Sequence, residues 1–198
     1  MSFRKEIKFK LSNLNLQILK SSLLEDGMKC IYPKRRVTSC YFDTNNLDFF
    51  HESENGILPR YKFRIRSYDG KDIFYKETKI TSIEGRFKTS KNISKEKAFY
   101  YIQNGIVFKG YGNIKSKLEI SYMRDYYVYR NCRLTFDYKI SYLNKSRFKQ
   151  MPLLDDLNVM ELKTSINQDN SFLERLFPFQ STSFSKYVRG ISKTNFVY

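Results

Sequence analysis

The sequence predicts a mainly β fold of the α+β class: a closed antiparallel barrel of eight strands around a tunnel, with a few helices outside it. Aromatic residues are frequent, with 16 Tyr and 17 Phe against 8 Gly and 4 Pro, which favours strands with broad faces. Several segments of strand length alternate charged and apolar residues, and a strand sends successive side chains to opposite faces. If the apolar faces pack beneath helices, the charged faces must line the inside of the barrel.

The eight strands are expected within one domain that spans residues 1–198, because no linker or low-complexity tract interrupts the chain. Alternating runs bounded by turn residues place them at 3–10, 37–44, 60–68, 72–80, 84–91, 116–129, 132–143 and 158–165. Hairpin turns are expected at Asp69-Gly70, at Gly85 and at Asn131.

Helical segments are expected at 12–27, 94–105, 170–177 and 185–190. Ser12 and Ser94 can cap the first two, because a Ser hydroxyl accepts a hydrogen bond from a first-turn N–H group. Gly27 and Gly105 can end them. Apolar residues recur at helical spacing in the first segment, at Leu14, Ile18, Leu19 and Leu23.

The segment from Arg60 to Arg66 is the most informative part of the chain. It places four cations, Arg60, Lys62, Arg64 and Arg66, on one strand face without a compensating acid. A single strand of this pattern is usually a solvated amphipathic strand. Like charges at a spacing of about 7 Å repel one another unless an anion lies in front of them, so the row favours a phosphate-rich ligand.

Charged faces recur on other expected strands. They carry Arg4, Glu6 and Lys8; Glu77 and Lys79; Arg86 and Lys88; Arg133, Thr135, Asp137 and Lys139; and Glu161 and Lys163. The formal charge of +16 favours polyanionic partners, and 17% aromatic residues keep a nucleic-acid binding module open as an alternative. Carboxylates beside the cations count against that alternative, because they repel a phosphate backbone unless a metal ion intervenes.

Several other classes are disfavoured. The three cysteines, Cys30, Cys40 and Cys132, show no C-x-x-C spacing, so neither a disulfide framework nor a zinc knuckle is indicated. The chain has no glycine-rich phosphate loop, and its one histidine, His51, lies outside every motif. With no secretory leader and no run of roughly 18 apolar residues, we expect a soluble cytoplasmic protein.

Short motifs in the charged strands occur in a recognisable order. They are Arg4-Lys5-Glu6-Ile7-Lys8-Phe9, Ser39-Cys40-Tyr41-Phe42-Asp43-Thr44, Arg64-Ile65-Arg66-Ser67-Tyr68, Glu77-Thr78-Lys79, Tyr122-Met123-Arg124, Arg133-Leu134-Thr135-Phe136-Asp137, Glu161-Leu162-Lys163 and Ser183-Phe184-Ser185-Lys186-Tyr187. In this order they resemble the VTC domain of the CYTH-like triphosphate tunnel superfamily, whose best-known members are polyphosphate polymerases. The resemblance covers nearly the whole chain.

The resemblance implies a set of site residues. Catalytic roles fall on Lys8, Arg64, Arg66, Lys79, Arg124, Arg133 and Lys186, and further phosphate contacts on Arg60, Lys62, Arg86, Lys88, Lys163, Tyr122 and Ser185. A divalent cation, Mn²⁺ or Mg²⁺, would bind Glu161, with Glu6 and Glu119 as weaker candidates. The Arg86-Phe87-Lys88 segment departs from the K-x-R pair usual in the family, and its inward register is open. Arg4 stands where the superfamily's hydrolases have a first Glu, which favours the VTC branch over the metal-rich triphosphatases.

The implied activity is a metal-dependent transfer of the terminal phosphoryl group of ATP to a growing polyphosphate chain. Such a reaction needs alignment and charge neutralisation more than a protein nucleophile. Water as the acceptor would make a triphosphatase, and binding without turnover would make a polyphosphate sensor. The expected partners are ATP and inorganic polyphosphate, with no nucleic acid; a membrane partner protein and the oligomeric state stay open.

Overall fold

The computed structural model of the chain describes residues 4–146, 151–165, 176–177 and 179–195. Its strands are β1 (Arg4–Leu11), β2 (Lys29–Asp43), β3 (Arg60–Tyr68), β4 (Phe74–Ser82), β5 (Gly85–Ile93), β6 (Ile106–Phe108), β7 (Gly112–Tyr129), β8 (Cys132–Asn144), β9 (Leu153–Leu154) and β10 (Asn158–Ser165). Its helices are α1 (Asn13–Glu25), α2 (Asp48–Glu54), α3 (Lys95–Asn104) and α5 (Lys186–Asn195). The mainly β class is confirmed.

The strands pair in the order β1-β10-β8-β7-β2-β3-β4-β5, with β6 beside β7 and β9 beside β8. The described pairings are antiparallel, as expected. The chain divides into two compact units. Unit 1 comprises residues 1–35, 122–140 and 155–184, and unit 2 comprises residues 36–121, 141–154 and 185–198. That the chain forms one domain stays a prediction.

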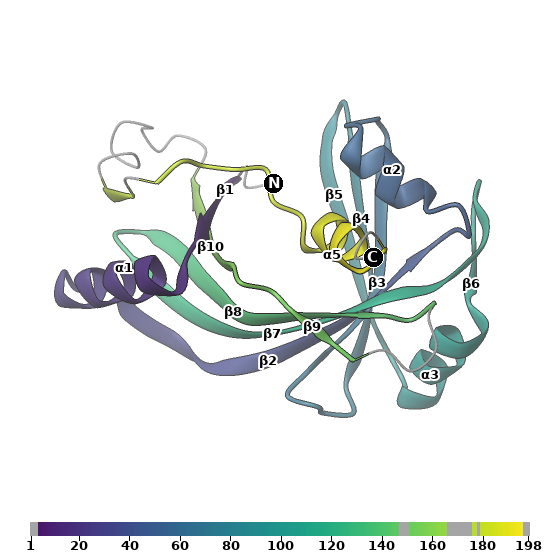
Figure 1. Cartoon of the computed structure of the whole chain (residues 1–198), viewed down its shortest axis with the longest axis horizontal. Coiled ribbons are helices and arrows are strands. Elements are labelled where there is room, and N and C mark those ends of the chain that lie inside the picture. The colour runs from purple at the N-terminus through teal and green to yellow at the C-terminus, as the bar shows by residue number, and fades with distance from the viewer. Residues whose placement is uncertain (1–3, 147–150, 166–175, 178, 196–198) are drawn as a thin grey trace. The chain divides into compact units, whose positions relative to one another are not determined.

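Unit 1 builds its core on one face of the β1-β10-β8 sheet. The register aligns Ile7, Leu162 and Leu134 in one row across the three strands, and Phe9, Met160 and Phe136 in another. These rows pack with Leu19 and Leu23 of α1 in one hydrophobic cluster. Helix α1 lies next to β1 (Figure 1). Because side chains alternate along a strand, the charged residues between these positions lie on the opposite face.

Helix α1 forms where its cap and its periodicity predict. The Ser12 hydroxyl accepts a hydrogen bond from the Asn15 N–H group at 3.1 Å, which satisfies one of the free donors of the first turn. Only part of its apolar set is buried, since Leu14 and Ile18 are 65% and 60% exposed. Helical spacing therefore identified the helix, and of its four predicted apolar positions Leu19 and Leu23 are buried in the core, while Leu16 packs against it.

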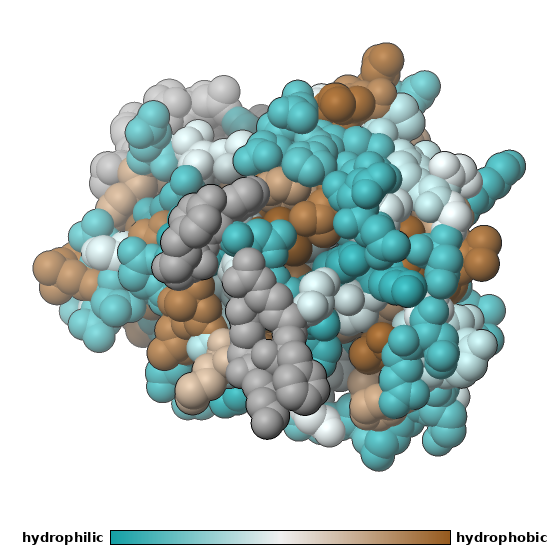
Figure 2. All heavy atoms as spheres, turned by 45° about the vertical axis from the view of Figure 1, so that its right-hand side comes forward, coloured by the Kyte–Doolittle hydropathy of each residue, from teal (hydrophilic) through white to brown (hydrophobic). Residues whose placement is uncertain are grey.

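Unit 2 contains the β2-β3-β4-β5 sheet. Its apolar face carries Phe42 and Phe63, whose rings meet edge to face at 5.2 Å, and Phe49 of α2 packs on the nearby Tyr61. Helix α2 lies beside both β3 and α5 (Figure 1). Elsewhere hydrophilic residues cover much of the face drawn in Figure 2, and exposed hydrophobic residues form separate patches.

The structure differs from the expected elements in several places. Helix α2 and the short strands β6 and β9 were not predicted, β2 begins at Lys29, and α5 extends to Asn195. Strand β4 lies two residues further along the chain than expected. The helix expected over 170–177 falls almost entirely outside the described residues. These misses concern short or locally weak elements, which packing rather than periodicity decides.

Candidate functional site

The charged face of unit 2 carries a dense set of cations, which we call the unit-2 array: Arg60, Lys62, Arg64 and Arg66 of β3, Lys79 of β4, and Arg86 and Lys88 of β5. The register places Lys62, Lys79 and Lys88 directly opposite one another across three strands, and Arg60 in line with Thr81 and Arg86. The open question of register is thereby answered, because Arg86 and Lys88 share the face of Arg64.

Glu77 is the carboxylate within this array. It lies opposite Arg64 on β4 and is 5% exposed. Its Oε2 atom accepts from Arg64 Nε at 2.7 Å and lies 3.8 Å from Arg66 Nη1, while its Oε1 atom pairs with Lys88 Nζ at 2.5 Å. Burial by itself would raise the pKa of the Glu77 carboxyl, but Arg64, Arg66 and Lys88 lower it to about 2. Glu77 is therefore ionised and bound to cations through both oxygens.

Two residues of β2 complete the guanidinium contacts, and sequence reasoning did not assign them. The Tyr41 hydroxyl accepts a hydrogen bond from Arg64 Nη1 at 2.7 Å, and the Ser39 hydroxyl accepts one from Arg66 Nε at 3.1 Å. Both belong to the Ser39–Thr44 motif and lie opposite their arginines in the register. Motif order could have indicated them, but only strand pairing identifies their partners.

The start of α5 also contacts this array. Ser185 Oγ accepts a hydrogen bond from Lys62 Nζ at 2.9 Å, and the Val188 N–H group donates to the same oxygen at 3.3 Å. The Ser185 hydroxyl therefore both caps α5 and orients Lys62 of the array. Lys186 follows directly and is half-buried.

Unit 1 carries a second set on its charged face, which we call the unit-1 array: Glu6 and Lys8 of β1, Glu161 and Lys163 of β10, Arg133 and Thr135 of β8, and Arg124 of β7. One row across three strands aligns Glu6, Lys163 and Arg133, and the next aligns Lys8, Glu161 and Thr135. An acid thus lies opposite a base in both rows where β1 meets β10.

The carboxylates of the unit-1 array are held by lysines. Lys163 Nζ lies 3.0 Å from Glu161 Oε1 and 4.0 Å from Glu6 Oε2, and Lys8 Nζ lies 3.3 Å from Glu6 Oε1. Burial by itself would raise the pKa of the Glu161 carboxyl, but Lys163, Arg124 and Lys8 lower it to about 2. Lys8 Nζ also donates to the Phe184 carbonyl oxygen at 3.0 Å.

Arg124 has a protein partner of its own. Its Nε and Nη2 atoms donate to the two oxygens of Asp137 at 2.5 and 2.7 Å, and Asp137 is fully buried. The guanidinium also lies over the Tyr122 ring, 5.2 Å from its centroid. Such a bidentate pair fixes the plane of the guanidinium, so Asp137 orients Arg124.

Thr135 is an unassigned member of the unit-1 array. It is 8% exposed, and its Oγ1 atom is buried without a hydrogen-bond partner among the described residues. A buried hydroxyl without a partner is costly. Thr135 lies opposite Glu161 on the charged face, so this hydroxyl belongs to the unit-1 array.

The unit-1 array suits a divalent cation only together with a phosphate ligand. No group of three or more His, Cys, Asp or Glu side chains that could hold a metal occurs in the described parts of the chain. Glu6 and Glu161 share one face of neighbouring strands, and Mg²⁺ is typically bound by one or two carboxylates, substrate phosphates and water. The residues present fit that arrangement.

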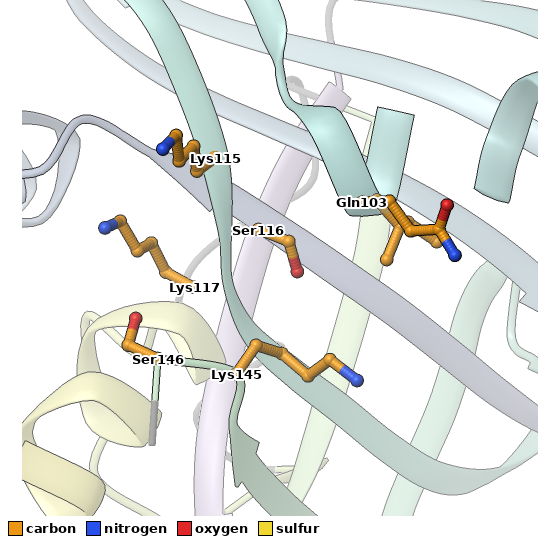
Figure 3. A pocket seen from close by; sticks show the side chains of 7 residues that line it. Gln103, Lys115, Ser116, Lys117, Lys145 and Ser146 are labelled. Carbon is orange, nitrogen blue, oxygen red and sulfur yellow. The ribbon is translucent and has the colours of Figure 1, made fainter. Parts of the chain in front are cut away.

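A pocket of about 350 Å³ in unit 2 contains none of the predicted site residues. Gln103 of α3, Ser116 of β7 and Lys145 line it, together with Ile102, Lys115, Lys117 and Ser146. In Figure 3 the ammonium groups of Lys115 and Lys117 point away from that of Lys145, so the three cations do not converge.

A family model described as VTC domain matches residues 3–109 and 107–195. The chain belongs to the VTC domain family. No curated protein matches it.

Solved structures share the fold at low sequence identity. A proposed adenylate cyclase from Bacillus halodurans has a TM-score of 0.64 and 14% identity, over 96% of each chain. A proposed adenylyl cyclase from Hippeastrum, reported with a dominant triphosphatase activity, has a TM-score of 0.58 and 14% identity over 98% of each chain. A conserved hypothetical protein from Pyrococcus furiosus has a TM-score of 0.58 and 15% identity, over 96% of this chain and 100% of its own.

Proposed function

We propose that this VTC domain transfers the terminal phosphoryl group of ATP to inorganic polyphosphate, in a metal-dependent reaction. The observation that carries the proposal is the cation rows of unit 2, in which lysines lie directly opposite lysines on neighbouring strands. The like charges of these lysines repel one another, and a chain of phosphates along the rows would relieve that repulsion. Membership of the VTC domain family supports the same substrate class.

The two arrays support different parts of the reaction. Arg64 and Arg66 present planar donors suited to phosphate oxygens, and Lys62, Lys79 and Lys88 act as compact charges. Glu161, aided by Glu6, would hold Mn²⁺ or Mg²⁺ against phosphate oxygens, and the metal would neutralise developing charge. Phosphoryl transfer needs mainly alignment and charge stabilisation, so the chain needs no nucleophile of its own.

A second candidate is a triphosphatase, in which water replaces the polyphosphate acceptor. The activity reported for the Hippeastrum structure favours it. Both reactions would use the same phosphate contacts, and they differ only in the acceptor. A third candidate is a polyphosphate sensor without turnover, which would keep the cation rows and need no metal.

The experiment is incubation of the protein with ATP and Mn²⁺ or Mg²⁺, followed by separate assays for long-chain polyphosphate and for free phosphate. Polymer formation supports the polymerase, and free phosphate without polymer identifies a triphosphatase. If neither polymer nor free phosphate forms and the protein still binds polyphosphate one to one, the sensor would replace both enzyme candidates. Tighter binding of RNA or duplex DNA than of polyphosphate at physiological salt would overturn all three.

The cellular setting is also a proposal. No helix in the described parts of the chain is both long and apolar enough to cross a bilayer. We propose a cytoplasmic site of action, with ATP and polyphosphate as partners and with a separate membrane protein if the polymer is to leave that compartment.

A further inference from the structure

Helix α5 packs directly on the strands of unit 2. A Cβ atom at Gly190 would come within 2.6 Å of Leu118 Cδ2 and of Tyr142 Cδ1, so only glycine allows this approach. Tyr187, Ile191 and Thr194 lie on the same buried face of the helix. The helix therefore has one closely fitted position against β7 and β8.

Tyr187 is tied to a buried carboxylate. Its hydroxyl donates a hydrogen bond to Asp43 Oδ2. Asp43 is fully buried and also accepts from the N–H groups of Thr44, Phe49 and Phe50, at 2.8, 2.9 and 3.0 Å. The Asp43 carboxylate thus caps α2 and also binds α5 through Tyr187. The hydrogen bonds that it accepts offset the cost of burying its charge.

Tyr187 also contacts the unit-2 array through a second tyrosine. The Tyr187 and Tyr41 rings stack, with centroids 5.0 Å apart and planes at 15°. The Tyr41 hydroxyl accepts from Arg64, whose guanidinium lies 5.6 Å from the centroid of the same ring. One continuous set of contacts therefore joins Asp43 to Tyr187, Tyr41 and Arg64.

We infer that Asp43 and Tyr187 are positioning residues that set the orientation of Arg64 through Tyr41. The inference rests on the proposed function, because it assumes that Arg64 binds phosphate. Glu77 holds the guanidinium through Nε and Nη2, and the Tyr41 hydroxyl holds it through Nη1, so a displaced Tyr41 ring would shift the Nη1 end of the guanidinium. The anchored tyrosine pair keeps it on the face that a phosphate chain would occupy.

The test is Tyr187→Phe, which keeps the ring and removes the hydroxyl bonded to Asp43. We expect tripolyphosphate affinity, measured by calorimetry, to fall about three- to tenfold, the effect of losing one well-placed hydrogen bond. Tyr111→Phe is the matched control, because Tyr111 donates to a carboxylate of the same unit, Glu52, at 2.6 Å. Its affinity should stay within about twofold of the unmodified protein.

A double-mutant cycle distinguishes positioning from general stabilisation. In an Arg64→Ala background, Tyr187→Phe should cause no further loss of affinity, although it should still lower the thermal unfolding midpoint. Asp43→Asn, which keeps the size of the side chain, should show the same dependence on Arg64.

Two outcomes overturn the inference alone: unchanged affinity in Tyr187→Phe, or the same loss with and without Arg64. A different outcome, in which the unmodified protein fails to bind tripolyphosphate, overturns the proposed function and removes the premise of the inference with it. Because calorimetry measures binding without turnover, the two failures are distinguishable.

Discussion

Both arrays combine arginines and lysines with carboxylates, but their carboxylates are held in different ways. Glu77 of unit 2 is bound through both oxygens, by two arginines and a lysine. Glu161 of unit 1 has its ion pair with Lys163 through Oε1, while the nearby Arg124 is bound to Asp137. The pKa of each carboxyl is lowered to about 2.

The difference shows that ionisation alone does not make a carboxylate a metal ligand. Arg64 and Arg66 hold Oε2 of Glu77 and Lys88 holds Oε1, so Glu77 is engaged by three cations and orients Arg64 and Arg66. Glu161 is paired with one lysine through Oε1, and one lysine is a compact point charge that a metal ion displaces more readily than three cations. We therefore propose that a metal ion would bind at the unit-1 array and that the unit-2 array would hold the phosphate chain.

The largest expected effect is a difference between the Glu161→Gln and Glu77→Gln variants. Glu161→Gln should reduce metal-dependent turnover by at least about 100-fold, because losing a metal ligand costs more than losing one of its outer-shell partners, while tripolyphosphate affinity is kept or rises because a repelling charge is lost. Glu77→Gln should instead lower the thermal unfolding midpoint, because it leaves clustered cations without a counter-charge, and should not change the Mn²⁺ concentration needed for turnover. Turnover measured across a Mn²⁺ titration checks both. An equal change in metal requirement in the two variants would contradict the assignment.

A smaller effect is expected on stability against pH. The pKa values of Glu77 and Glu161 are lowered from 4.5 to about 2 in the folded protein. Their contribution to stability is therefore complete above about pH 4.5 and is lost as the pH falls towards 2. Urea unfolding between pH 6 and 2.5 should show this loss, and Glu77→Gln or Glu161→Gln should each make the profile shallower. A profile that neither substitution changes would show that other carboxyls govern acid unfolding.

The smallest expected effect tests the unpartnered hydroxyl of the unit-1 array. Thr135→Val keeps the shape and removes a buried hydroxyl without a partner, so the free energy of unfolding should be unchanged or slightly raised. Tripolyphosphate affinity should fall about two- to tenfold if the hydroxyl contacts the ligand. Thr164→Val is the control, because Thr164 is buried on the opposite face of β10. Equal affinities of the two variants would remove Thr135 from the site.

Much of the fold could be predicted from local pattern. Strand β3 was placed at its exact bounds, because seven residues of unbroken alternation leave one assignment. Helix α1 was predicted from Ser12 and its periodicity. Helix α2 was missed. The Asp43 side chain stabilises it by accepting hydrogen bonds from the N–H groups six and seven residues further along the chain, and a periodic sequence pattern does not reveal such a contact.

The sequence by itself determined which residues share a charged face, because alternation along a strand is a property of the backbone. It also determined the family, through the order of its motifs. Only the tertiary structure decided which charges pair. The register placed Glu77 beside Arg64, and it left the Thr135 hydroxyl buried opposite Glu161. The packing of α5 brought Tyr187 onto Tyr41 across 146 residues of chain. Pairing of this kind depends on distances between strands and helices, which the local pattern of a sequence does not contain.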